Sequence, residues 1–507
     1  MPEGVPQPFT SASLSRVAEP HGASLLHQCR KTSLLARHNL ARVGRLRRAL
    51  GIPNPIWFYC LADELAANWA AIRTHLGTSR LSITRPVRRP TIPRAVEARI
   101  PHPDRAPVRA RHRAMGRFVL VADIQRCYPA IYTHSIPWAL HSKSVAKVNR
   151  SRALLGNRLD RLVSLAQDGQ TRGIPIGPDT SFVISEIVLT GVDQILEQRL
   201  GRIAGFRASD DFEIVFSSRG VAEEGRAILQ EALASFELEI NEEKTRIQEL
   251  PEPLDDTWPL RLRTLPLRTT GRAITGDLVT YFGIAFELSK AFPTDSVLRY
   301  AISRVHGITM PGVPWPLYHD LLMQCATAEP GTLKFVLSEL RRYKSVGYQL
   351  DDDRLREALT ALIVRHTPLG HGSEVAWAVW AHISLGITLA KPAADLLPTL
   401  DDSLVPLLAL HADDRGLVPS GLDKSAWASA MTGDGLYGPH WLLAYEANIK
   451  GWLPSVGPDH VAADPYFRQL KSKGVSFYNV RAPSVTIRRW RRRLGLAALA
   501  LYDFGAV

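Results

Sequence analysis

Two adjacent carboxylates, Asp210 and Asp211, lie between short apolar runs in residues 205–216. This pattern predicts a tight β-hairpin that carries acidic residues at its tip. The chain has five runs of adjacent aspartates, so the dipeptide alone does not decide a function. A third acid, Asp123, follows the apolar run 118–122, which is short enough for a buried strand and would place the acid at the strand's exit.

Acids that converge from separate strands can hold two divalent cations about 3.5–4 Å apart. Such a pair of ions activates an attacking hydroxyl group and stabilises a departing pyrophosphate. Mg²⁺ is the expected ion, with Mn²⁺ as an alternative, because hard cations bind carboxylate and phosphate oxygens. Taken separately, Asp123 and the pair of Asp210 and Asp211 could be an ordinary helix cap and an ordinary acidic turn. The surrounding segments must therefore decide between this alternative and a metal site.

Five segments follow one another in an informative order. They are Asp123-Ile124-Gln125-Arg126-Cys127-Tyr128, then residues 173–181 (Gly-Ile-Pro-Ile-Gly-Pro-Asp-Thr-Ser), 208–211 (Ala-Ser-Asp-Asp), 238–245 and 281–284 (Tyr-Phe-Gly-Ile). Together they resemble the four catalytic motifs and the primer-gripping hairpin of a reverse transcriptase. The resemblance covers about residues 80–290, and five motifs in the family's order make it specific.

The resemblance implies roles for the acids and their neighbours. Asp123 and Asp210 would bind both metal ions, Asp211 would assist, and the Ile124 carbonyl would be a further ligand. Lys244 would act as a general acid for pyrophosphate or as a charge neutraliser. For this lysine, which lies beside two glutamates, a merely solvated side chain is the alternative.

Three further residues would contact the nucleotide or the template in such an enzyme. Tyr128 would lie beneath the sugar, where an aromatic ring excludes a 2′ hydroxyl, so dNTPs are the expected substrates; packing under the sheet is the alternative. Gly177 would let the backbone approach the template–nucleotide pair without a Cβ. Ser181 would cap the helix that follows.

Within this family, residues 173–181 and 131–140 look similar to bacterial reverse transcriptases of the abortive-infection and phage-defence group. That likeness implies a DNA polymerase, RNA-templated or template-independent, in anti-phage defence. Its partners would be an RNA template or non-coding RNA, dNTPs and a DNA product. Two residues depart from the family: Ala208 replaces the usual aromatic residue before the paired acids, and Ile176 replaces a frequent glutamine.

Because Ala208 removes a ring expected near the primer terminus, a second hypothesis stays open. It is a catalytically weak nucleic-acid-binding scaffold whose basic patches carry the function. A metal nuclease is disfavoured, because Tyr128 and the glycine motif would then have no task.

A length of 507 residues predicts two or three domains. The expected fold class is α+β, with the fingers and split βαβ palm of a right-hand polymerase followed by an all-α, helical-repeat C-terminal domain. The expected domains are 1–115 (N-terminal helices and basic fingers), 116–290 (palm) and 291–507 (helical). The expected N-terminal helices span 25–50 and 56–76. The palm should contain strands at 118–123, 245–250 and 278–288, a hairpin at 206–216, and helices at 180–200 and 221–235.

Charge and hydropathy indicate the class of partner and the compartment. A net charge of +13 and a pI of about 9.7 favour a polyanionic partner such as nucleic acid. Residues 80–117 contain eleven arginines, and residues 488–493 place five arginines around one tryptophan; solvated surfaces are the alternative for both. No apolar run is long enough for a membrane span, so a cytoplasmic protein without a membrane partner is expected. A homo-oligomer is compatible with the sequence.

Overall fold

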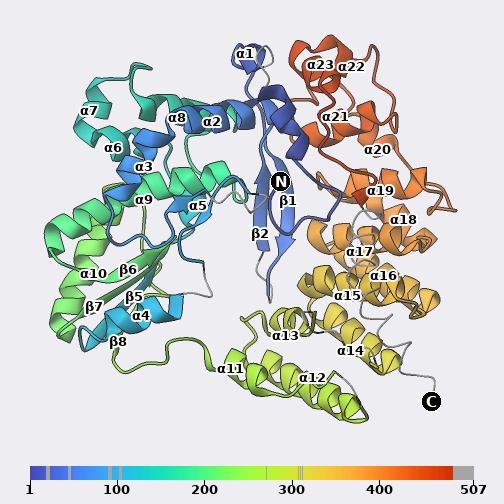
Figure 1. Cartoon of the computed structure of the whole chain (residues 1–507). Helices are drawn as coiled ribbons and strands as arrows, with labels where there is room; N and C mark the ends of the chain where they lie inside the picture. Colours follow the sequence, from blue (N-terminus) through green and yellow to red (C-terminus); the bar gives the residue numbers. More distant parts are fainter. Residues whose placement is uncertain are drawn as a thin grey trace. The chain divides into compact units, whose positions relative to one another are not determined.

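The computed structural model describes residues 1–18, 23–43, 47–88, 94–101, 105–269, 271–306, 308, 310 and 312–482. The chain forms two compact units (Figure 1). The unit that we call the sheet unit comprises residues 23–35 and 51–255, and the helical unit comprises 1–22, 36–50 and 256–507. The division into domains 1–115, 116–290 and 291–507 stays a prediction. The basic segment 488–493 lies outside the described residues.

The sheet unit contains a four-stranded antiparallel sheet with the strand order β6-β7-β5-β8. Its strands are β5 (Phe118–Asp123), β6 (Ala204–Ala208), β7 (Asp211–Phe216) and β8 (Arg246–Glu249). Ser209 and Asp210 form the turn between β6 and β7, and Ser209 adopts a left-handed conformation with φ of 57°. In the register of β5 and β7, Asp123 lies opposite Asp211. The predicted strand at 118–123 and the hairpin at 206–216 are confirmed.

One face of this sheet packs on two helices, α9 (Asp179–Leu200) and α10 (Arg219–Ala234). Successive side chains along each strand point to opposite faces, so that the pair Leu120 and Ile214 faces these helices. The shared core contains Leu120, Ala122, Phe212 and Ile214 from the strands, Ile184, Ile187 and Val188 from α9, and Leu229 and Leu233 from α10. Burying each large aliphatic side chain contributes about 1.5–3 kcal/mol.

The remaining elements of the sheet unit lie before α9. α2 begins at Pro55, and the Asn54 side chain accepts a hydrogen bond of 3.2 Å from the Ile56 N–H, as expected for a helix cap. The predicted helix at 56–76 is present as α2 and α3, which meet at Asn68. The elements are α1 (Ala23–Leu26), α2 (Pro55–Ala67), α3 (Trp69–Gly77), β3 (Pro86–Val87), β4 (Glu97–Ala98), α4 (Arg105–Arg113), α5 (Cys127–Ala130), α6 (Ser135–His141), α7 (Lys143–Val148) and α8 (Leu155–Leu165).

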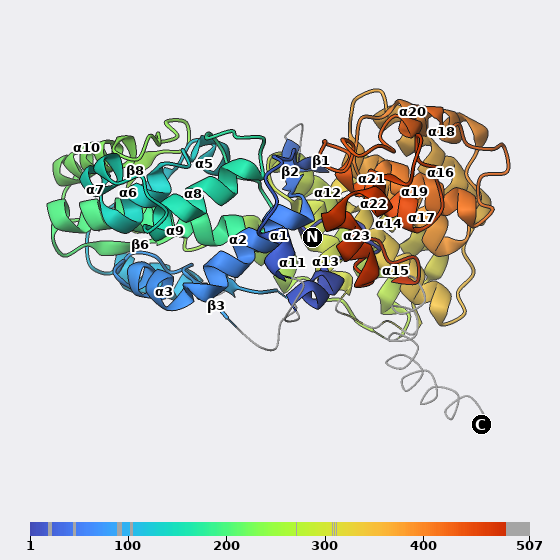
Figure 2. The same cartoon turned by 90° about the horizontal axis from the view of Figure 1, so that it is seen from above.

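The helical unit contains a two-stranded sheet, formed by β1 (Ala36–Ala41) and β2 (Arg47–Ile52), and a series of helices. Helices α16, α17 and α19 lie side by side (Figure 2). Short 3₁₀ segments are η1 (Ala12–Ala18), η3 (Pro330–Thr332) and η4 (Leu397–Thr399). The α-helices are α11 (Thr257–Thr264), α12 (Ala273–Ala291), α13 (Val297–His306), α14 (Trp315–Ala328), α15 (Leu333–Ser345), α16 (Asp352–His366), α17 (Gly372–Leu385), α18 (Lys391–Leu396), α19 (Val405–Asp414), α20 (Ser425–Ala428), α21 (Trp441–Ile449), α22 (His460–Ala463) and α23 (Pro465–Ser472).

Two expectations about secondary structure are wrong. The segment expected to be one helix at 25–50 contains the short helix α1 and strands of β structure, because His38 and Arg47 each have buried acidic partners that an isolated amphipathic helix would not reach. The expected strand 278–288, with its hairpin at 281–284, lies within helix α12. There Ile274, Leu278, Tyr281 and Phe282 are buried at helical spacing. Within the described residues, no helix is long and apolar enough to cross a bilayer.

Candidate active site at the edge of the sheet

The structure brings together the three acids that the sequence singled out. Asp123 is the last residue of β5, Asp210 lies in the β6–β7 turn, and Asp211 begins β7. One carboxylate oxygen from each residue lies within 4.8 Å of the other two. The Ile124 N–H donates a hydrogen bond of 3.2 Å to the Asp210 carbonyl, which ties the strand's exit to the turn. Asp123 is buried, whereas Asp211 is exposed.

Lys244 and Asn241 hold the buried acid from a third segment. Lys244 Nζ lies 2.6 Å from Asp123 Oδ2, and Asn241 Nδ2 donates to the same oxygen at 3.2 Å. The Asn241 N–H also donates to the Asp123 carbonyl at 2.7 Å. The lysine side chain is 65% exposed, so it contacts the carboxylate without leaving solvent. Lys244 is therefore paired with an acid of the cluster, and its role as general acid or charge neutraliser stays a prediction.

The electrostatics of the three acids favour a cation. Burial of its carboxyl group, followed by the charges of Asp210 and Asp123, raises the pKa of Asp211 from its usual 3.8 to about 6. Arg105 and Lys244 partly oppose this rise. The residue as a whole is exposed, so solvent screens part of the repulsion. A divalent cation between the carboxylates would relieve this repulsion.

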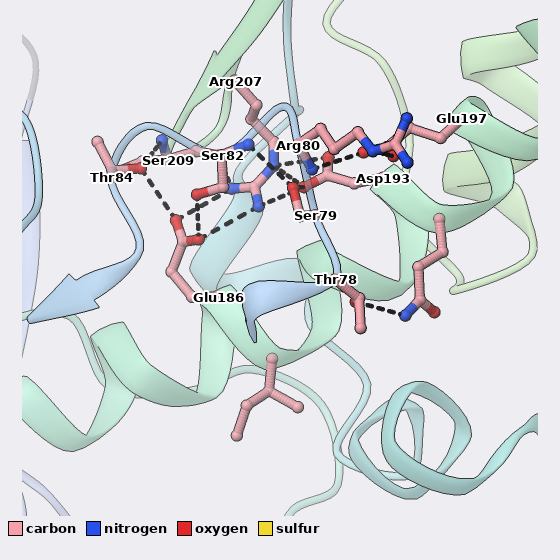
Figure 3. A network of polar contacts seen from close by, with 12 residues as sticks. Thr78, Ser79, Arg80, Ser82, Thr84, Glu186, Asp193, Glu197, Arg207 and Ser209 are labelled. Carbon is pink, nitrogen blue, oxygen red and sulfur yellow. Dashed lines mark hydrogen bonds and ion pairs between the residues drawn. The ribbon is translucent and has the colours of Figure 1, made fainter. Parts of the chain in front are cut away.

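A buried ionic network lies directly beneath the β6–β7 turn (Figure 3). The Arg207 guanidinium is fully buried and binds the carboxylates of Asp193 at 2.7 Å and Glu186 at 3.0 Å, both from α9. Arg207 also donates to the Ser209 carbonyl at 2.8 Å. The Ser209 N–H donates to Thr84 Oγ1 at 2.7 Å. The strained turn that carries Asp210 is thus held on both sides of its left-handed residue.

The loop 79–84 completes this network. Ser79 donates to Asp193 at 2.6 Å, and Ser82 and Thr84 donate to Glu186 at 2.8 and 3.1 Å. Because every charged group in the network has several partners, the desolvation cost of burying it is offset. Sequence reasoning missed these residues. The available signals were an arginine inside an apolar strand and two acids seven residues apart on the buried face of a helix.

The opposite face of the sheet carries the helix α4. Val108 of α4 packs near Phe206 and Ala208, which belong to the face that also presents Glu213. Arg109 and Arg113 of α4 bind the Glu213 carboxylate at 2.6 and 3.1 Å. α4 therefore lies over β6 and β7, on the side of the sheet that Asp123 and Asp211 share. Ala208 occupies buried space beneath this helix, where an aromatic ring would need room.

The arginine at the start of α4 faces the acids. Arg105 feels the negative charges of Asp211, Asp210 and Glu213, although burial outweighs them and lowers its pKa. Its Nε has no hydrogen-bond partner among the described residues. The basic stretch expected to be polymerase fingers thus supplies a guanidinium group to the neighbourhood of the acidic cluster.

Tyr128 lies in the short helix α5, close to the second predicted motif. The Ile174 N–H donates to the Tyr128 carbonyl at 2.9 Å, and Ser185 Oγ lies 3.3 Å from the Tyr128 hydroxyl. Burial raises the pKa of Tyr128, with a smaller contribution from Asp210. The half-buried ring also packs against the core of the sheet unit. This position is compatible with both predicted roles, a sugar contact and packing under the sheet.

The structure bears differently on the predictions for Gly177 and Ser181. Gly177 has φ of 122°, a conformation that side-chain-bearing residues rarely adopt. Ser181 is buried within the first turn of α9, whose N-cap is Pro178 without a side-chain cap. It lines an apolar cavity with Trp57 and Ile184. The expected capping role of Ser181 is therefore wrong, because the serine lies within the helix and not at its N-cap. The nucleotide or template contacts of Ser181 and Gly177 and the role of the Ile124 carbonyl stay predictions.

Comparisons with known proteins give only distant likenesses. No protein-family model and no curated protein sequence matches the chain. Similar solved structures include apo telomerase from Candida tropicalis, at 11% identity over 65% of this chain and 68% of that chain with a TM-score of 0.35. Telomerase from Candida albicans, in complex with a TWJ fragment of telomeric RNA, matches at 13% identity over 78% and 65% with a TM-score of 0.32. The corresponding RNA complex from Candida tropicalis matches at 11% identity over 64% and 63%, with a TM-score of 0.33.

The chain thus spans 63–68% of the length of these telomerase chains.

Proposed function

We propose that this chain is a reverse-transcriptase-like DNA polymerase that adds dNTPs with the help of two divalent metal ions. The observation that carries the proposal is the convergence of Asp123, Asp210 and Asp211 at one edge of a four-stranded antiparallel sheet. These acids come from a strand end and a hairpin far apart in sequence. Two-metal catalysis needs ligands that converge on a pair of ions about 3.5–4 Å apart, and these three carboxylates converge in that way.

The residues present fit Mg²⁺. Three carboxylate groups offer only hard oxygen ligands, and Mg²⁺ binds few protein carboxylates while completing its octahedron with water and substrate phosphates. Burial of its carboxyl group and the charges of Asp210 and Asp123 raise the pKa of Asp211, and a bound cation would oppose this rise. Mn²⁺, with similar ligand preferences, is the alternative ion.

Each residue then has a task of its own. Asp123 and Asp210 would orient the reacting groups through the ions, which when bound activate a 3′ hydroxyl and neutralise the departing pyrophosphate. Lys244 holds the Asp123 carboxylate at 2.6 Å and would release it, or share it, when a cation arrives. The Arg207 network fixes the turn beneath Asp210, so that the carboxylates are preorganised.

The substrates and the biological setting are part of the same proposal. The positive net charge of +13 suits nucleic acid, and the motifs from 123 to 245 favour an RNA template or a non-coding RNA, dNTPs and a DNA product. The likeness of residues 173–181 and 131–140 to the phage-defence group motivates a role in bacterial anti-phage defence. Template-independent synthesis is retained within the proposal.

One observation favours a second candidate, a nucleic-acid-binding scaffold with weak catalysis. Helix α4 lies on the face of the sheet from which a substrate would reach Asp211, because α9 and α10 cover the other face. A chain that kept α4 in this place during binding would restrict access to the acids. The catalytic and scaffold hypotheses therefore differ in whether nucleotides are incorporated at all.

Incorporation of labelled dNTPs by the purified chain, with and without added RNA, separates the two candidates. The polymerase proposal predicts Mg²⁺-dependent incorporation that the double variant Asp210→Asn/Asp211→Asn loses while keeping its fold and its RNA affinity. Asp353→Asn is the matched control, because it alters an exposed aspartate of another acidic run. Equal incorporation by the wild type and the double variant would refute the proposed site. If the wild type binds RNA but incorporates no nucleotide, the result would support the scaffold hypothesis.

A further inference from the structure

A second group of potential metal ligands lies in the helical unit. His366 ends α16, His371 precedes α17, and Glu374 lies in the first turn of α17. One ligand atom from each residue lies within 4.8 Å of the other two. His366 and Glu374 are buried, whereas His371 is half-buried and gives the cluster access to solvent. Nothing in the proposed polymerase chemistry uses these residues.

The distances within the cluster match the size of a metal ion. The Nδ1 atoms of His366 and His371 are 2.9 Å apart, and Glu374 Oε1 lies 3.9 and 3.7 Å from them. The point equidistant from three atoms with these separations lies about 2.1 Å from each of them. Zinc binds imidazole nitrogen at about 2.0–2.1 Å and carboxylate oxygen at about 2.0–2.2 Å. An ion could therefore bind with little movement of the side chains.

The carboxylate of this cluster is held in a fixed orientation. Arg47 of β2 donates to Glu374 Oε1 at 2.5 Å and to Oε2 at 2.7 Å. Arg47 is fixed in turn by Asn39 of β1, whose side chain accepts from its Nε at 3.0 Å. Hydrogen bonds to a ligating carboxylate commonly orient it for a metal. Oε1 can accept from Arg47 through one lone pair and bind an ion through the other.

The two imidazole rings face each other through the nitrogens that would bind the ion, since His366 Nδ1 lies 2.9 Å from His371 Nδ1. An ion on both Nδ1 atoms would replace this hydrogen bond between the rings. His366 Nε2 has no hydrogen-bond partner among the described residues.

We propose that His366 Nδ1, His371 Nδ1 and Glu374 Oε1 bind one Zn²⁺ ion. Two imidazoles and one carboxylate suit zinc better than Mg²⁺ or Ca²⁺, which prefer sites made only of oxygen ligands. The ion would bridge the turn between α16 and α17 and, through Arg47 and Asn39, tie it to β1 and β2. Asn39 already donates to the Gly370 carbonyl of this turn at 2.8 Å. The role assigned to the ion is to stabilise the helical unit.

The test measures zinc in the full-length chain after removal of any affinity tag. Mass spectrometry of the metal content, after gel filtration in buffer with Zn²⁺, should give about one zinc per chain. Zinc should also raise Tm relative to the protein treated with EDTA, and Co²⁺ should give the visible absorption of a nitrogen-ligated site. His371→Gln, at the half-buried ligand, should lose both the bound zinc and the Tm rise while keeping the far-UV spectrum.

Two control variants assign the ion to this cluster. His306→Ala alters a histidine that pairs with Glu339 in the same unit and belongs to no group of three metal ligands among the described residues, and it should keep the zinc. Asp211→Asn alters the acidic cluster of the sheet unit and should keep it as well. Absence of stoichiometric zinc in the wild type, or retention of the zinc by His371→Gln, would overturn the proposal. Loss of zinc in Asp211→Asn would assign the ion to the acidic cluster and would also overturn the proposal.

Discussion

Replacement of Asp211 by asparagine should stabilise the metal-free protein at neutral pH. The substitution keeps the size of the side chain and removes one of three negative charges that lie together. Two unit charges at 4.8 Å, the upper limit of the separations between these carboxylate oxygens, repel by about 3.5 kcal/mol at an effective dielectric constant of about 20. The rise of the Asp211 pKa from 3.8 to about 6 corresponds to about 3 kcal/mol. Because the residue is exposed, we discount this to about 1 kcal/mol.

The pH dependence of this effect has a definite sign. The pKa of Asp211 is higher in the folded chain than in the unfolded chain, so folding disfavours the ionised form. The penalty is absent below about pH 3.8, grows between 3.8 and about 6, and is complete above 6. The stability difference between Asp211→Asn and the wild type should therefore be small at pH 4 and about 1 kcal/mol at pH 7.5.

Urea unfolding of both proteins in EDTA, at pH 4 and pH 7.5, measures this difference. Added Mg²⁺ should stabilise the wild type more than the variant and should reduce or reverse the difference at pH 7.5. A variant that is less stable than the wild type at pH 7.5 in EDTA would refute the electrostatic reasoning. A difference that does not change with pH would refute it as well.

Three further substitutions test the parts around the acids. Arg207→Met should destabilise the sheet unit by about 3–5 kcal/mol in urea unfolding, because it leaves Glu186 and Asp193 buried without their cation; an unchanged midpoint would contradict this. Ala208→Tyr should cost about 1–3 kcal/mol in the same assay, because the residue is buried beneath α4, and Ala208→Ser is the mild control. Lys244→Met should lower dNTP incorporation by about 10²–10⁴-fold if the lysine is a general acid, whereas a change below tenfold in single-turnover rates would assign it to charge neutralisation alone.

The sequence was sufficient to locate the acids, because each of them follows or begins a strand with a clear pattern. The apolar run before Asp123 and the hairpin around Asp210 predicted where the backbone would turn, and the order of the motifs placed the pieces in one sheet. The convergence within 4.8 Å then followed from the register of β5 and β7, which pairs Asp123 with Asp211.

The elements that sequence reasoning predicted wrongly or missed depend on contacts between segments that are distant in the sequence. Residues 278–288 contain aromatic and β-branched residues that favour a strand, yet helical packing of Leu278, Tyr281 and Phe282 prevails. The acidic partners of the Arg207 side chain lie on α9, and the loop 79–84 donates hydrogen bonds to these acids, so no local pattern could assign the network. The position of α4 on the sheet depends on Glu213, which by itself resembles any strand acid.

The most direct test of the central claim is the rate of labelled dNTP incorporation by Asp123→Asn in Mg²⁺. Asp123 is the acid that comes from a separate strand, so the two-metal site depends on it. We expect the rate to fall at least about a hundredfold, with the folded structure retained. Incorporation at the wild-type rate by this variant would show that the three acids do not form the catalytic centre.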